Sequence, residues 1–193
     1  RAVPDQPSSL RLRFETVGSI AAIVVGVIAL FVSWDQARVM RQDIRASVWP
    51  ALQVQGFVDT AQGLALGLRV ENAGVGPALI ERITVRQDGV VITDIDDLRS
   101  RIHESADLSF DTATGRVLAS GAEFQPFAFR TDDPSGLLGV EGPVDPLRAS
   151  RAFSGWTAEL CYCSTLGDCW TADMTTNPPA ETDSCDAEDA SAL

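Results

Sequence analysis

The sequence predicts a mainly β protein in which one N-terminal transmembrane helix continues into a stalk and then into an antiparallel β-sandwich, immunoglobulin-like in outline. Two patterns predict this fold class. Residues 16–34 are apolar and carry no charge, and after Pro50 apolar and polar residues alternate with a period of two. We therefore expect a polar N-terminal segment (1–15), a transmembrane helix (16–34) and a helical stalk (35–49). A sandwich domain (50–175) and an acidic, disordered tail (176–193) are expected to follow.

The uncharged stretch is long enough to cross a lipid bilayer. Its nineteen residues span about 30 Å, which is the thickness of a hydrocarbon core. Phe14 and Trp34 lie at its ends, where interfacial aromatic residues belong. A cleaved signal peptide is one alternative, but Trp34 and Asp35 make a poor cleavage site. A buried helix of a soluble protein is the other, and it is disfavoured because apolar residues occupy every face.

Small residues form a stripe on this helix. Gly18, Ala22 and Gly26 recur every four residues, so they share one face and permit close approach of a second helix. The alternative is that small residues are simply common in membrane helices. From the stripe we predict that the partners are other membrane protein subunits, which the transmembrane helix contacts within the lipid bilayer.

The helix is expected to continue beyond the membrane as a stalk. No glycine or proline interrupts residues 35–49, and Met40 and Ile44 are spaced by four residues. We expect the helix to end near Ser47, because Pro50 disfavours helical backbone at the residue before it.

Short strands separated by turn residues are expected in the rest of the domain, and a small open barrel is the alternative to a sandwich. Residues 72–77 are rich in turn residues, and Asp88-Gly89 predicts a two-residue hairpin turn. From Thr175 onward the chain has five acidic residues and no basic one, so we expect this tail to be disordered. Strands are expected at residues 51–58, 63–71, 78–86, 90–93, 116–119, 123–130, 157–164 and 170–174, and helices at 94–105 and 145–153.

Composition limits the partners. The chain has 27 acidic and 15 basic residues for a net charge of -12, and every basic residue is arginine. Because an acidic surface repels phosphate backbones, we expect no nucleic-acid partner. We interpret the missing lysine as the codon bias of a GC-rich bacterial genome. Since the chain begins with Arg1 rather than methionine, we expect further residues before it.

Four cysteines are the main candidates for chemistry: Cys161, Cys163, Cys169 and Cys185. Cys161 and Cys163 lie two residues apart on an expected strand, so both side chains point to one face. Cys163 and Cys169 flank a five-residue loop, which would make them near cross-strand partners at disulfide distance. Cys161 could then pair with Cys185. Free buried cysteines and a metal site remain as alternatives.

We predict no catalytic, metal or cofactor site elsewhere. His103 is the only histidine, and we expect it on the surface rather than acting as a metal ligand or a base. The acidic clusters lack the glycine and glutamate of an EF-hand loop, so solvated carboxylates are expected. No lysine follows Gly74 and Gly76, which favours a turn over a phosphate loop. We expect three tryptophans to pack in the core. The acidic clusters are Asp94, Asp96 and Asp97, and Asp132 and Asp133; the tryptophans are Trp49, Trp156 and Trp170.

Three motifs occur together in this chain: ASVWPALQV at residues 46–54, ENAGVGPALI at residues 71–80 and CYCSTLGDCW at residues 161–170. With these motifs the chain resembles a loose set of bacterial single-pass membrane proteins of uncharacterised function, over most of its length. The resemblance implies a shared architecture of helix, Trp-Pro step, glycine-rich turn and Cys-x-Cys hairpin. It implies no activity.

Location and function follow as hypotheses. Arginine counts on the two sides of the helix nearly tie, but an oxidising compartment suits a small domain braced by cysteines. We therefore expect the chain in the bacterial inner membrane, with a cytoplasmic N-terminus and a periplasmic domain. If the cysteines are reduced, the opposite orientation is favoured as much as this one. We predict a non-catalytic accessory or scaffolding subunit of an inner-membrane protein complex, without a cofactor. The alternatives are a periplasmic ligand-binding or sensing module and, less favoured, a thiol- or metal-dependent enzyme.

Overall fold

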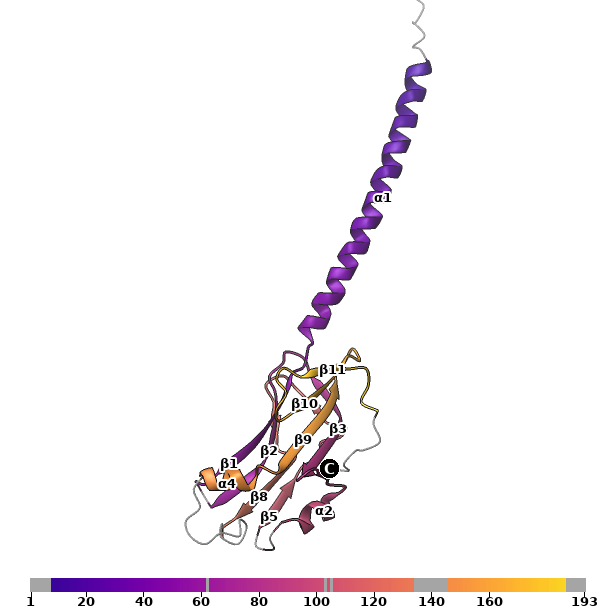
Figure 1. The fold of residues 1–193 in the computed structure, drawn as a ribbon. Helices are drawn as coiled ribbons and strands as arrows, with labels where there is room; N and C mark the ends of the chain where they lie inside the picture. Colours follow the sequence, from indigo (N-terminus) through magenta and orange to yellow (C-terminus); the bar gives the residue numbers. More distant parts are fainter. Residues whose placement is uncertain (1–7, 62, 103, 105, 134–145, 187–193) are drawn as a thin grey trace, which may run out of the picture. The chain divides into compact units, whose positions relative to one another are not determined.

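The computed structural model describes residues 8–61, 63–102, 104, 106–133 and 146–186. The chain divides into two compact units, Arg1–Ala46 and Ser47–Leu193. The first unit contains one helix, and the second contains all the described strands (Figure 1). The predicted fold class is confirmed, because an apolar N-terminal helix precedes a mostly β domain with two antiparallel sheets.

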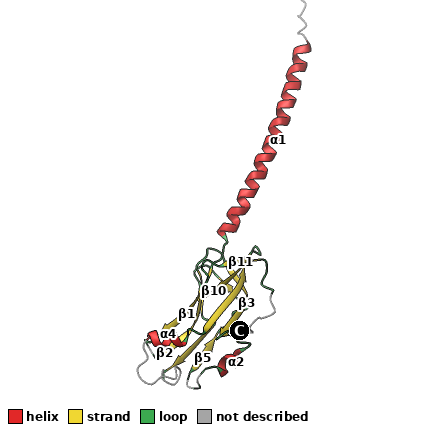
Figure 2. Cartoon of the chain, in the orientation of Figure 1, coloured by secondary structure: helices red, strands yellow, loops and turns green. Residues whose placement is uncertain are grey.

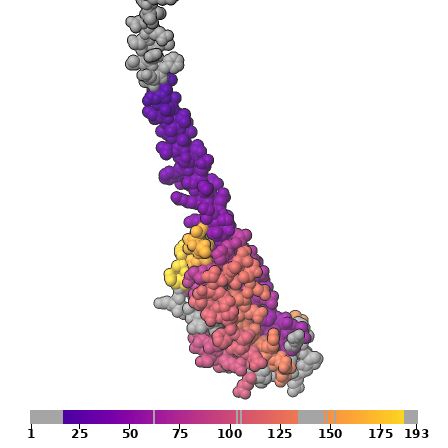
Figure 3. Space-filling view, turned by 180° about the vertical axis from the view of Figure 1, so that it is seen from behind, coloured from indigo at the N-terminus to yellow at the C-terminus, as the bar shows by residue number. Residues whose placement is uncertain are grey.

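The first unit is dominated by one unbroken helix, α1, Ser8–Ser47. It begins inside the polar segment expected at residues 1–15 and ends where Pro50 predicts. Val17–Ser47 is long and apolar enough to cross a membrane, and no other helix in the described ranges is. From Val17 onward its large apolar side chains are exposed, and Phe31 keeps 73% of its surface accessible. Figure 3 shows one face of α1, on which the side chains of its coloured part are uncovered.

The second unit contains two sheets, which we call sheet A and sheet B (Figure 2). The strands of sheet A are β1 Leu52–Asp59, β2 Leu64–Asn72, β5 Asp107–Phe110, β7 Glu123–Phe124 and β8 Phe127–Thr131. Those of sheet B are β3 Ala78–Gln87, β4 Val90–Val91, β6 Val117–Leu118, β9 Trp156–Cys163, β10 Cys169–Asp173 and β11 Ala180–Thr182. The described helices of this unit are α2 Ile95–Ser100 and α4 Pro146–Ala152.

All strand pairs in the two sheets are antiparallel. Sheet A has the order β1-β2-β8-β5, with β7 also pairing with β2. Sheet B has the order β11-β10-β9-β3-β4, with β6 also pairing with β3. Neighbours such as β2 and β8, or β3 and β9, lie far apart in the sequence. The sheets therefore assemble from long-range pairings as well as hairpins.

The core lies between the two sheets, and period-two alternation along β9 shows which face contributes to it. Trp156, Ala158, Leu160 and Tyr162 are buried there, whereas the residues between them are on the other face, which we call the outer face of sheet B. The Tyr162 hydroxyl accepts a hydrogen bond of 3.1 Å from the Leu52 backbone N–H, which ties sheet B to β1 of sheet A. Each large apolar side chain buried in this way contributes roughly 1.5–3 kcal/mol to folding.

Most predicted strands agree with the structure within a few residues. Asp88 and Gly89 have φ of 50° and 82° and form the predicted two-residue turn, in which Gln87 pairs with Val90. Trp156 and Trp170 are in the core, as expected, but Trp49 is 41% exposed and the prediction for it was wrong. Trp49 precedes β1 where the chain enters the domain, so the sandwich interior does not enclose it.

Two strands were not predicted, β5 and β11. The expectation of a disordered tail from residue 176 was wrong for β11, which pairs with β10. The segment is polar and short, so composition alone argued against order. Its main-chain pairing, and a disulfide at Cys185 described below, supply the stabilisation that composition does not reveal. Residues 187–193 of the same tail lie outside the described residues.

Candidate functional site

The cysteines gather on the outer face of sheet B. Cys161 and Cys163 alternate with the core residue Tyr162 on β9, so both point away from the core. Cys169, at the start of β10, is paired with Cys163 across the two strands. The hairpin therefore places three cysteines on one face, as the spacing of the sequence predicted.

The structure joins the four cysteines in two disulfides. Cys163 is bonded to Cys169, with their Cα atoms 4.0 Å apart, and Cys161 is bonded to Cys185, with their Cα atoms 5.6 Å apart. Cys185 reaches the sheet because β11 pairs with β10 and the chain then continues back over the outer face. The Ser184 carbonyl oxygen lies 3.9 Å from Cys161 Sγ, and Cys161 is only 1% exposed.

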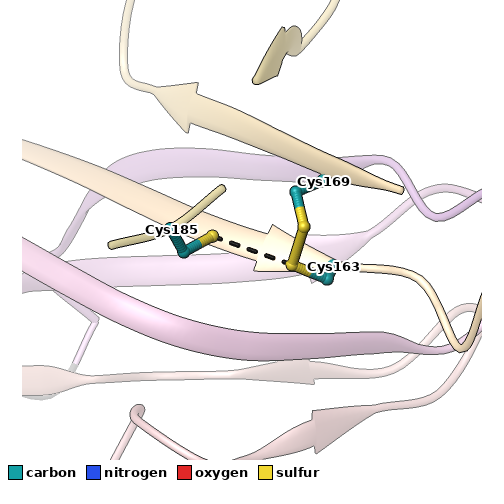
Figure 4. A group of neighbouring side chains, drawn as sticks. All are labelled: Cys163, Cys169 and Cys185. Atoms are coloured by element: carbon teal, nitrogen blue, oxygen red, sulfur yellow. Dashed lines mark hydrogen bonds between the residues drawn. A yellow bond between two sulfur atoms is a disulfide. The ribbon is translucent and has the colours of Figure 1, made fainter. Parts of the chain in front are cut away.

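The two disulfides touch each other. Cys163 Sγ lies 3.8 Å from Cys185 Sγ, as the dashed line in Figure 4 shows. The sulfur atoms of Cys163, Cys169 and Cys185 all lie within 4.8 Å of one another. Cys161 adds a fourth sulfur through its bond to Cys185. We call these four residues the cysteine cluster.

One arginine lies beside the cysteine cluster. Arg82 on β3 is paired with Cys161 across the sheet, and its Nη1 donates a hydrogen bond of 3.1 Å to the carbonyl oxygen of Cys185. Its side chain is only 11% exposed, and Nη2 lies 3.6 Å from a carboxylate oxygen of Glu159. Within the described part of the chain, the buried Nε–H of Arg82 has no hydrogen-bond partner. Positive charge is therefore held next to the Cys161–Cys185 bond.

This arrangement permits thiol and disulfide chemistry. A sulfur atom in a disulfide is not a thiolate, so zinc binding by the cysteine cluster would require reduction first. A thiolate next to a disulfide can instead exchange with it. The sequence identified the four cysteines but not Arg82, because the β3–β9 pairing that brings Arg82 to Cys161 joins distant segments.

The glycine-rich motif proves to be a turn between β2 and β3 that is built around the buried Asn72. The Asn72 side chain accepts hydrogen bonds from the N–H groups of Ala51 and Gly74, and its Nδ2 donates to the carbonyls of Gly76 and Leu118. All four hydrogen-bond partners of this side chain are backbone groups, so Asn72 holds three segments of the main chain together. The motif therefore stabilises the fold, as a strand-to-strand turn was expected to do.

The same turn holds the Trp-Pro step in place. The N–H groups of Val75 and Gly76 both donate to the carbonyl of Trp49, at 3.0 and 3.2 Å. A Cβ added to Gly76 would overlap the backbone of Val48. The two motifs, separated in the sequence, thus form one contact where the chain enters the domain.

Two carboxylates of the first acidic cluster, those of Asp94 and Asp97, have structural roles. Asp94 caps α2, since its side chain accepts from the Asp97 N–H at 2.8 Å. Hydrogen bonds from Arg101 and from the Thr93 N–H lower the pKa of Asp97. The N–H of Asp133 donates to the Thr131 hydroxyl. His103 lies outside the described residues.

Two grooves lie elsewhere on the domain. One, of about 220 Å³, is lined by β1 and the residues that follow β10. Burial raises the pKa of Asp173 there, but hydrogen bonds from Thr175 and Thr176 outweigh it and lower the value to about 2. The other, of about 520 Å³, contains Arg116, whose guanidinium lies 4.7 Å from the ring centre of Phe124. Several polar groups that line them have partners within the protein, among them Asp173, which accepts from Thr175 and Thr176, and Arg116, which donates to Asp111.

Comparison with protein families identifies the family of this chain. Residues 17–165 match the family described as "Domain of unknown function (DUF8453)", which is more than half of the 193 residues. The chain belongs to this family. The matched region of the DUF8453 family includes the apolar part of α1 together with most of the sandwich. A search among curated proteins finds no match.

Proposed function

We propose that this DUF8453 protein is a single-pass inner-membrane protein that acts as a non-catalytic accessory or scaffolding subunit of a membrane protein complex. The observation that carries the proposal is the exposure of the apolar side chains of α1 from Val17 onward. Transfer of such surface from water to an apolar environment is favourable by about 25 cal/mol per Å². Lipid and partner helices provide that environment, so the helix serves as both anchor and contact.

The small-residue stripe supports a helix partner. A Cβ added at Gly18 or Gly26 meets no other atom within 4 Å, so the backbone is open on this face. Close approach of a second helix at such positions gains van der Waals contacts that bulkier side chains prevent. The stripe gives the proposed contact a position on α1.

The polar groups of the domain support a non-catalytic role. Among the described residues, clear pKa shifts occur at Asp97, Tyr162 and Asp173. Burial in the core accounts for the raised pKa of Tyr162, and hydrogen bonds from nearby residues account for the lowered pKa values of Asp97 and Asp173. A shifted group that serves structure in this way is a poor candidate for acid–base catalysis.

The cysteine cluster supports a periplasmic location. Two disulfides in a small domain are typical of oxidising compartments, which would place the N-terminus of α1 in the cytoplasm. The resemblance to bacterial single-pass membrane proteins agrees with this arrangement. Protease added to spheroplasts should then digest the domain, and protection of the domain would require the opposite orientation.

Co-purification tests the accessory role. The full chain, expressed at native level and solubilised in mild detergent, should retain other membrane proteins that mass spectrometry identifies. Gly26→Leu should reduce their recovery several-fold, because the added side chain holds the partner helix away. Val24→Leu is the matched control, since it places leucine on the opposite face of α1 and should leave recovery unchanged. A lone monomer in detergent, or equal recovery for the two variants, would refute the proposed contact.

A further inference from the structure

The two disulfides of the cysteine cluster are in contact and differ in exposure at one residue. Cys163, Cys169 and Cys185 are partly exposed, whereas Cys161 is 1% exposed. The contact between the two bonds is made by Cys163 and Cys185, whose sulfur atoms are 3.8 Å apart. A thiolate formed at Cys163 would therefore lie next to a disulfide sulfur without movement of the sheet.

We propose that the cysteine cluster is a thiol–disulfide exchange site, in which reduction of the Cys163–Cys169 bond is passed on to the Cys161–Cys185 bond. The external reactant is a dithiol, either a small molecule or a dithiol protein. This inference requires neither the membrane anchor nor a partner subunit, so it stands apart from the accessory role.

The exchange balances as two reactions. First, the dithiol gives two electrons and two protons to the Cys163–Cys169 bond, becomes a disulfide itself and leaves two thiols. Second, Cys163 loses its proton to water, and its thiolate attacks Cys185 Sγ. The Cys163–Cys185 bond forms as the Cys161–Cys185 bond breaks, and the electron pair remains on Cys161, which takes a proton from water. The second step conserves oxidation state and needs no further reactant.

Arg82 favours the leaving group of the second step. Arg82 is paired with Cys161 across the sheet, and its side chain, 11% exposed, donates to the carbonyl oxygen of Cys185. A neighbouring positive charge stabilises a thiolate. Glu159 offsets part of this charge, but the buried Nε–H, which lacks a partner among the described atoms, remains free to donate. Arg82 therefore acts as a positioning residue for the Cys161 thiolate.

Chain geometry allows both linkages to be populated. The native bond joins residues 24 apart, and the exchanged bond joins residues 22 apart. Because loop-closure entropy depends weakly on length, the two linkages constrain the unfolded chain almost equally. Exchange moves the anchor of the C-terminal segment from Cys161 to Cys163 and releases a buried thiol. The redox state of the exposed hairpin is thereby coupled to the attachment of this segment.

Disulfide mapping of a full-chain variant in which one cysteine is replaced, purified in detergent, tests the proposal. Cys169→Ser leaves Cys163 without its partner, so acid quenching, alkylation and mass spectrometry should find a mixture of Cys161–Cys185 and Cys163–Cys185 bonds. Each form should make up roughly a tenth of the molecules or more. In the control Cys163→Ser, which frees Cys169 instead, exchanged bonds to Cys185 should be several-fold rarer. Only the native bond in Cys169→Ser, or equal exchange in both variants, would overturn the proposal.

The wild-type chain provides a second measurement that does not depend on the folding of a variant. Limiting dithiothreitol should yield a partly reduced species with a Cys163–Cys185 bond and with Cys161 and Cys169 alkylated. Partly reduced molecules that are alkylated only at the two ends of one native bond would exclude internal exchange. Arg82→Gln should slow the appearance of the new bond several-fold and Arg82→Lys should restore it, whereas equal rates in all three chains would remove Arg82 from the mechanism.

Discussion

The helix and the sandwich treat apolar residues in opposite ways. On α1, Leu30 and Phe31 keep 72% and 73% of their surface exposed, whereas Leu64, Leu68 and Ile80 in the sandwich are 0% exposed. The same hydrophobic effect acts on both regions. The sandwich buries its apolar side chains within the chain, whereas those of the helix can be buried only by other molecules. Exposure of apolar surface, rather than its amount in the sequence, therefore marks where this protein interacts with its surroundings.

The glycines of the two regions should respond most differently to mutation. In the sandwich, Gly76→Ala would force a Cβ onto the backbone of Val48, and we expect a loss of about 4 kcal/mol in stability. On α1, Gly26→Ala meets no atom within 4 Å and should change stability by less than about 1 kcal/mol. Urea denaturation followed by tryptophan fluorescence measures both. Similar losses for the two variants would remove the distinction between the regions.

The second largest difference between the two regions is expected when a charge is introduced into each. Val24 on α1 and Val90 on β4 are 51% and 56% exposed, so the two sites are matched. Val24→Arg should weaken membrane insertion by about 3 kcal/mol, and Val90→Arg should have no effect on it. Alkaline extraction of membranes measures the retained fraction. Full retention of Val24→Arg would mean that this part of α1 is not in lipid.

Within the sandwich, the two disulfides should contribute unequally. The Cys161–Cys185 bond joins residues 24 apart, and the Cys163–Cys169 bond joins residues 6 apart. The loop-entropy model then predicts that replacing the first pair by alanine costs about 3 kcal/mol and replacing the second costs about 2 kcal/mol. Denaturation of the two double variants measures the difference. The reverse order would show that constraint of the unfolded chain is not the main contribution.

The smallest expected effect concerns Tyr162, the only tyrosine of the chain. Burial raises its pKa from 10.0 to about 12, against the opposing hydrogen bond from Leu52. The neutral hydroxyl thus stabilises the folded state fully below pH 10, and this contribution of about 1–2 kcal/mol, after discounting for solvent screening, is lost as pH rises from 10 to 12. Tyrosinate absorbance should show ionisation near pH 12 in the folded chain, and Tyr162→Phe should abolish this pH dependence. Ionisation near pH 10 in the folded chain would contradict the burial.

Local patterns predicted much of the fold. The end of α1 near Ser47 follows from Pro50, and the β3–β4 turn follows from Asp88-Gly89, because both depend on neighbouring residues. Strand β11 and the exposure of Trp49 could not be predicted in this way. The first depends on pairing with β10 and on the Cys185 disulfide, and the second on which residues the sandwich encloses.

The candidate site, too, could be predicted only in part from the sequence. The spacing of Cys161 and Cys163 shows that they share a face, since side chains alternate along a strand. The return of Cys185 over that face, and the position of Arg82 beside it, depend on the β11–β10 and β3–β9 pairings.

By itself, the sequence determined the apolar helix, the alternation that makes the domain mostly β, and the cysteine hairpin. Each of these depends on interactions between residues close in the chain. Only the tertiary structure decided the contact between the two disulfides, the partly buried Arg82 beside them and the hydrogen bonds around Asn72. These features join segments dozens of residues apart, and the free energy that brings such segments together comes from burying the whole core rather than from any local preference.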